Sequence, residues 1–127
     1  MKSKVFVYGT LMRGYGNHSL LNNSSYLGEG QLQGYSMYHV SSFPGIVKSD
    51  TNNCIKGELY EVTPEELKRL DRLEGEGHLY KRVTEEIKMA GQGLVHAFTY
   101  VWLGSVKNCQ EVIETPWEPL KINYEWR

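Results

Sequence analysis

The chain has 127 residues, enough for one domain with a single hydrophobic core. Its 14 basic and 15 acidic residues give a net charge of -1, which excludes a protein that binds nucleic acid or an anionic membrane through its overall charge. No apolar run approaches the roughly 20 residues of a membrane span or the apolar core of about 7–15 residues in a secretory signal. We therefore expect a cytosolic protein, in which Cys54 and Cys109 remain free thiols.

The first half of the chain predicts short, bent strands. Residues 5–8 are β-branched or aromatic and end at Gly9, which predicts a buried strand followed by a loop. Asn17 is expected to cap a short helical turn. Between residues 26 and 40, glycines alternate with aromatic and apolar residues, a spacing typical of bulged strands in a barrel wall. Residues 43–45 predict a turn, and residues 55–62 alternate as a strand.

The clearest element is a helix over residues 63–73. Thr63 is its N-cap, Pro64 occupies the first helical position, and Glu66 completes a capping box. Gly75 ends the helix. Two further strands are expected at about 81–89 and 94–102. The pattern predicts a mixed α+β fold, a small β-barrel flanked by short helices.

This helix turns a carboxylate inward. At about 100° per residue, Leu67, Leu70 and Leu73 form the apolar stripe, and Glu74 falls between Leu67 and Leu70. Burial and the negative end of the helix dipole both raise the pKa of such a carboxyl, which makes Glu74 a candidate general base. The alternative is that the helix frays and Glu74 is solvated.

Four ordered segments resemble the γ-glutamylcyclotransferase-like superfamily, which includes the small γ-glutamylamine cyclotransferases. They are Phe6-Val7-Tyr8-Gly9-Thr10-Leu11, Gly57-Glu58-Leu59-Tyr60, Leu70-Asp71-Arg72-Leu73-Glu74-Gly75 and Tyr80-Lys81-Arg82-Val83. The resemblance covers about residues 4–102 of a single domain spanning 1–127. The tail, about 104–127, matches nothing, but its Trp117, Tyr124 and Trp126 are expected to pack on the body.

The resemblance implies a compact barrel with a cavity at one end and a small-molecule γ-glutamyl substrate. Glu74 would be the catalytic base, and substrate would be bound by Tyr8, Gly9, Thr10 and Leu11, largely through backbone N–H groups. The products would be 5-oxoproline and a free amine. Without the resemblance, Gly9 and Thr10 would be read as a strand-ending turn, and Tyr8 serves equally well to fill the barrel.

Tyr80 and Arg82 are expected to shape the cavity or support Glu74, although a strand-start aromatic and a solvated arginine fit them as well. Tyr100 is in phase with Phe98 and Trp102, which favours core packing.

No cofactor is expected. His18, His39, His78 and His96 lack metal-ligand spacing, so no metal site is expected either. Two functions compete with the enzyme: a non-catalytic binding protein that retains the cavity, and an interaction protein that uses its aromatic tail. The sequence leaves the oligomeric state and the leaving amine open.

Overall fold

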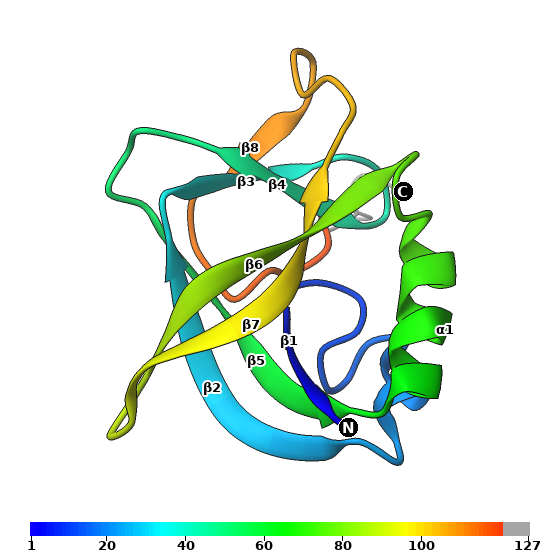
Figure 1. Cartoon of the computed structure of the whole chain (residues 1–127). Coiled ribbons are helices and arrows are strands. Elements are labelled where there is room, and N and C mark those ends of the chain that lie inside the picture. The colour runs from blue at the N-terminus through cyan, green and yellow to red at the C-terminus, as the bar shows by residue number, and fades with distance from the viewer. Residues whose placement is uncertain (121–127) are drawn as a thin grey trace, which may run out of the picture.

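The computed structural model describes residues 1–120, which form a closed five-stranded barrel with a smaller sheet and one α-helix beside it (Figure 1). The barrel order is β1 (Ser3–Val7), β5 (Cys54–Val62), β2 (Ser25–Gln33), β6 (Tyr80–Met89) and β7 (Gly93–Trp102). β7 closes on β1 in parallel, at Val5 opposite Phe98, and the other barrel pairs are antiparallel. The predicted mixed α+β barrel is therefore confirmed.

The smaller sheet lies across one end of the barrel (Figure 1). Its order is β4 (Pro44–Lys48), β3 (Tyr35–His39) and β8 (Gln110–Val112). The helical elements of the described chain are α1 (Pro64–Glu74) and the 3-10 helix η1 (His18–Leu21). None of the helices in residues 1–120 is long and apolar enough to cross a membrane.

Glycines let a phenylalanine fill the barrel. Phe6 is fully buried, and a Cβ atom on Gly57 would lie 2.7 Å from its ring and 2.4 Å from the carbonyl oxygen of Val7. On β2, a Cβ atom on Gly30 would lie 2.6 Å from Ile87. The strand over residues 25–33 is bulged near Gly28, as the spacing of glycines predicted.

The helix α1 begins and ends as the sequence predicted. The Thr63 hydroxyl accepts a hydrogen bond from the Glu66 N–H (3.2 Å), and the Glu66 carboxylate accepts one from the Thr63 N–H (2.7 Å). Gly75 adopts the left-handed conformation that ends the helix, with φ of 59°. The C-terminal end of α1 lies beside the start of β6 (Figure 1).

Two local predictions are wrong. The turn expected at residues 43–45 lies earlier, where the Val40 N–H donates to the Phe43 carbonyl (3.1 Å), and Pro44 and Gly45 already belong to β4. β4 is an edge strand, and its first position tolerates proline because no ladder N–H is needed there. The side chain of Asn17 does not cap η1. It binds Thr10 instead, as described below.

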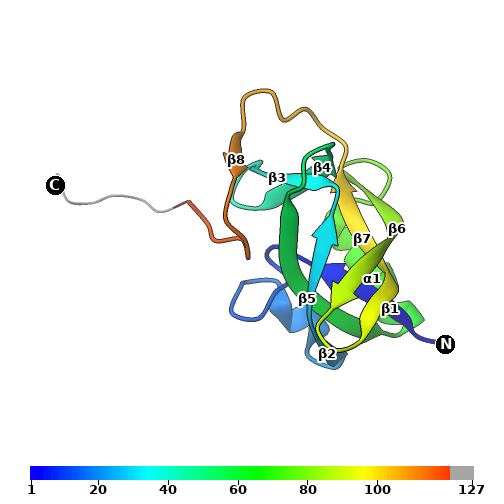
Figure 2. The same cartoon turned by 90° about the vertical axis from the view of Figure 1, so that its left-hand side faces the viewer.

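The described part of the tail packs on the body, as expected for Trp117. β8, which the sequence did not predict, pairs with β3, and Trp117 is 1% exposed. The Trp117 indole N–H donates to His39 Nδ1 (3.2 Å), and its carbonyl accepts from the Tyr15 hydroxyl (3.0 Å). Figure 2 shows the chain after β8 running back along the body before its last described residues turn away from it. The expectations for Tyr124 and Trp126 lie outside the described residues.

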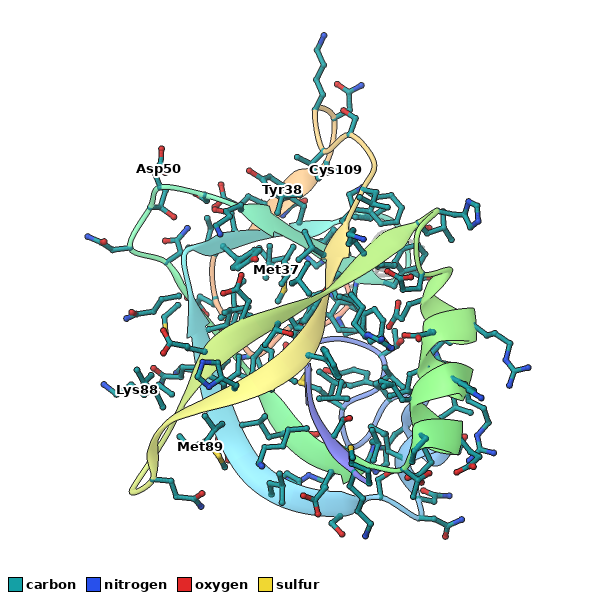
Figure 3. All side chains as sticks on the ribbon, viewed as in Figure 1. Met37, Tyr38, Asp50, Lys88, Met89 and Cys109 are labelled. Carbon is teal, nitrogen blue, oxygen red and sulfur yellow. The ribbon has the colours of Figure 1, made fainter. Side chains whose placement is uncertain are left out.

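Both cysteines are free thiols, as predicted. Figure 3 places Cys109 on the loop that leads into β8. Within residues 1–120, no three histidine, cysteine or acidic side chains gather closely enough to hold a metal ion.

Candidate functional site

A cavity of about 220 Å³ opens where the end of α1 meets the loop after β1. Clefts for drug-sized ligands usually measure roughly 300–1,000 Å³, so this one suits a group closer in size to an amino acid. The charged and polar side chains that line it are Glu74, Tyr8, Tyr80, Tyr100, Thr10, Asn17 and Ser42. Lys88 and Met89 lie where β6 meets the turn into β7, at the far end of the barrel from α1 (Figure 3), and this turn end does not contribute to the cavity.

Glu74 is the last residue of α1 and points into this cavity. Desolvation raises the pKa of its carboxyl from 4.5 to about 7. Among the described residues no hydrogen bond or ion pair offsets that cost. The carboxyl is therefore close to half-ionised at neutral pH and free to exchange a proton with a ligand.

Three tyrosine hydroxyls surround the cavity, and each already donates to a protein acceptor. Tyr8 donates to the carbonyl of Tyr100 (2.6 Å), Tyr80 to the carbonyl of Pro44 (2.7 Å), and Tyr100 to Asp71 Oδ1 (2.7 Å). Burial, with the nearby charge of Glu74 adding to it, raises the pKa of all three hydroxyls. They therefore stay protonated at neutral pH, and a ligand can use them only as acceptors.

The loop after β1 begins with a tight turn. The Met12 N–H donates to the Gly9 carbonyl (3.0 Å), which leaves Thr10 and Leu11 as the two central residues. The N–H groups of Thr10 and Leu11 take no part in this turn, and neither donates to another described residue. A Cβ atom on Gly9 would lie 2.7 Å from the Pro44 ring, so only glycine lets the turn approach β4 this closely.

Side chains fix this loop in place. The Asn17 amide donates to the Thr10 hydroxyl (2.9 Å), and the Asn17 N–H donates to the Thr10 carbonyl (3.1 Å). Further along the loop, the backbone N–H of Arg13 donates to Glu58 Oε1 (3.0 Å), and Nε of the Arg13 side chain lies 3.3 Å from Glu58 Oε2. The two free N–H groups are therefore held in position before a ligand arrives.

Arg82 does not line the cavity. Its guanidinium pairs with Asp71 Oδ2 at 2.5 Å, and Tyr100 binds the other oxygen of the same carboxylate. Asp71 lies one helical turn before Glu74, so this network ties the end of α1 to β6 and β7. Tyr8, Gly9, Thr10, Leu11 and Tyr80 do come together with Glu74 in the cavity lining, while Arg82 is placed behind it.

The sequence reasoning missed two contributors. The first is Asp71, whose partners Arg82 and Tyr100 come from β6 and β7, strands that local sequence patterns do not link to the helix. The second is Leu79, which lines the cavity and is 51% exposed. The available signal in the sequence was a leucine that follows Gly75 and Gly77 directly before a strand.

Comparison with known proteins places this geometry in a family. Residues 5–119 match the model of the family described as γ-glutamyl cyclotransferase, AIG2-like. The chain belongs to this family. Among curated members, it is 38% identical over 100 residues to a predicted γ-glutamylcyclotransferase of Methanocaldococcus jannaschii, covering 77% of this chain and 82% of that protein. It is 32% identical over 96 residues to the γ-glutamylaminecyclotransferase of Rattus norvegicus, covering 67% and 63% of the two chains.

Solved structures of AIG2-like proteins share the fold. The AIG2-like protein of Mus musculus superposes with a TM-score of 0.72 at 25% identity, covering 80% of this chain and 78% of that one. An uncharacterised protein from Pyrococcus horikoshii superposes with a TM-score of 0.69 at 32% identity, covering 87% and 86%. The γ-glutamylcyclotransferase-like barrel is thus the fold of this chain.

Proposed function

We propose that this protein cyclises a γ-glutamyl amide, with Glu74 as the general acid and base. The α-amine of the substrate attacks its own γ-carbonyl carbon, the amide C–N bond breaks, and 5-oxoproline and a free amine are released. The observation that carries the proposal is a carboxyl group with a pKa of about 7 that lines the same small cavity as a turn with two free N–H groups.

Proton transfer is the first requirement. The α-amine is largely protonated at neutral pH, since its ordinary pKa is about 7.7–8.0 or higher. The ammonium first releases one proton to solvent. Glu74 accepts a second proton from the attacking nitrogen as the new C–N bond forms, and returns a proton to the departing amine nitrogen. A carboxyl with a pKa near the working pH suits both steps, because it loses and gains a proton with little cost.

Charge stabilisation is the second requirement. The substrate carries an α-carboxylate, and attack on the γ-carbonyl develops an oxyanion. The N–H groups of Thr10 and Leu11 are aimed from a fixed turn, the arrangement in which backbone donors bind anions. The hydroxyls of Tyr8 and Tyr80 already donate within the protein, so we assign them the roles of shaping the cavity and accepting from the α-ammonium group.

Holding the substrate folded is the third requirement. The reacting amine and carbonyl belong to one molecule, so a cavity that fixes their orientation contributes several kcal/mol to the rate. Gly9 permits the close approach of the turn to Pro44, and Arg82 acts through Asp71 to hold the end of α1. We propose that Arg82 supports the position of Glu74 and does not contact substrate.

The test is 5-oxoproline release from a panel of γ-glutamyl amines and γ-glutamyl amino acids, with wild type beside Glu74→Gln. We expect turnover by the wild type and a loss of 10²–10⁴-fold in the variant, the usual value of general acid–base catalysis. Ligand binding without turnover would instead favour a non-catalytic binding protein. Retention of more than about a tenth of the wild-type rate by the variant would remove Glu74 from the mechanism.

A further inference from the structure

Three of the apolar side chains that line the cavity, Leu73, Leu79 and Phe43, are here called the apolar wall. Leu73 is 39% exposed and Leu79 is 51% exposed. Both leucines also line the cavity, so an apolar group bound there would cover side-chain area that is now open to solvent. The wall is therefore a surface that an apolar group can cover.

The apolar wall is held rigidly. The Leu79 N–H donates to the Gly75 carbonyl (2.8 Å), and the Leu79 carbonyl accepts from the Leu103 N–H (2.9 Å). Its side chain leans over Gly75, where a Cβ atom would lie 3.2 Å away. Phe43 packs against Tyr80 and Trp102, with ring centroids 6.4 and 6.0 Å apart. A ligand would thus meet this wall without having to order it.

The apolar wall lies next to the Glu74 carboxyl, the proposed general acid and base. Leu73 precedes Glu74 in α1, and Leu79 covers the glycine that follows it. In the proposed reaction Glu74 returns a proton to the departing nitrogen, so that nitrogen lies beside Glu74. Its substituent then extends along the wall toward the mouth.

The charge of the cavity lining also favours an uncharged leaving amine over an amino acid. Among the described residues that line the cavity, Glu74 is the one with a formal charge, and none is lysine, arginine or histidine. The leaving half of a γ-glutamyl amino acid carries a carboxylate next to the departing nitrogen. That carboxylate would stand close to Glu74 without a cation to pair with, and an unpaired charge in such a place is costly.

From these observations we infer that the apolar wall is the subsite for the leaving amine and selects an uncharged alkyl or arylalkyl amine over an amino acid or a diamine. The inference rests on the proposed cyclisation and adds the chemical class of its second product. Each further methylene of the amine that contacts the wall should raise kcat/KM about fourfold.

The experiment uses substrates that differ by one charged group. γ-Glutamyl-3-methylbutylamine and γ-glutamyl-leucine are identical except for the leucine carboxylate, and γ-glutamyl-pentylamine and γ-glutamyl-1,5-diaminopentane differ by one terminal ammonium. We expect the wild type to favour the uncharged member of each pair by at least tenfold in kcat/KM. Leu79→Arg should lower kcat/KM for γ-glutamyl-3-methylbutylamine. It should also reduce the ratio of this value to the kcat/KM for γ-glutamyl-leucine at least tenfold.

Leu94→Arg is the matched control. Leu94 is 61% exposed and pairs with Lys88 at the turn end of β6 and β7, far from α1 (Figure 3) and outside the cavity lining, so the same substitution there should leave both kcat/KM ratios unchanged. Equal turnover within each pair, or preference for the charged member, overturns the inference and leaves the cyclisation standing. A preference that Leu79→Arg does not alter overturns the role of the wall. No 5-oxoproline from any of the four substrates overturns the cyclisation and the inference together.

Discussion

Replacing Glu74 with glutamine should make the folded protein more stable as well as inactive. The Glu74 carboxyl has a pKa of about 7 in the folded protein because burial removes water from it, against an ordinary 4.5. Below about pH 4.5 the carboxyl is protonated in both the folded and the unfolded chain, so its burial carries no charge cost. Between about pH 4.5 and 7 the unfolded chain releases a proton that the folded protein retains, and stability falls as the pH rises.

The size of the effect follows from the shift. At 1.36 kcal/mol per pKa unit, a rise from 4.5 to about 7 corresponds to about 3 kcal/mol. The side chain opens on a cavity that water can enter, which lowers the expected figure to about 2 kcal/mol. Glutamine has nearly the same shape and no charge. Glu74→Gln should therefore unfold with a free energy about 2 kcal/mol higher than that of wild type at pH 8, and nearly equal to it at pH 4.

The measurement is urea unfolding of both proteins at several pH values between 4 and 8, with 5-oxoproline release assayed in parallel. The difference between the two proteins isolates residue 74, since every other carboxyl is common to both. Glu65→Gln is the control, because Glu65 is exposed on the same helix and lies outside the cavity lining. A difference that does not change with pH, or a Glu74→Gln variant less stable than wild type at pH 8, would refute the burial argument.

Three other predictions concern the site and its supports. The kcat/KM of the wild type should rise along an acid limb with an apparent pKa near 7, measured by 5-oxoproline release across pH, because the base form of Glu74 is required; a limb near 4.5 would contradict this. Tyr100→Phe should lose the hydrogen bond to Asp71 and lower the free energy of unfolding by about 1–2 kcal/mol, measured in urea; no change would show that this network does not hold α1. Trp117→Ala should cost about 3–5 kcal/mol in the same assay, and a cost under 1 kcal/mol would show that the tail is not part of the core.

The sequence predicted the parts of the site that local rules control. The capping box at Thr63 and Glu66 and the glycine stop at Gly75 set both ends of α1, and the helical period then fixed the direction of Glu74. The same period placed Leu73 on the inward stripe, yet Leu73 is 39% exposed. A helical wheel gives the direction of a side chain, but whether that direction meets core or cavity depends on the neighbouring loops.

What the sequence left open depends on contacts between distant segments. Asp71 and Arg82 are eleven residues apart, and their pairing follows from where β6 starts beside α1. β8 has only three residues and forms because β3 offers a free edge to the returning tail. A strand this short shows no recognisable alternation of apolar and polar residues in the sequence. The position of Asn17 predicted a cap, but the Thr10 hydroxyl was a competing acceptor that only the folded loop brings within reach.

Three costly features coincide at one cavity: a carboxyl buried without a partner, a turn with two unpaired N–H groups, and leucines open to solvent. Departures from ordinary packing rules usually mark functional sites when several of them gather at one place. A binding protein would account for the N–H groups and the leucines, since both gain from a ligand. It would not account for Glu74, because a cationic ligand is bound more tightly by a carboxylate with an ordinary pKa than by one that is half-protonated at neutral pH. A carboxyl held near pH 7 is useful when it must both take and return a proton, and this favours the cyclisation over simple binding.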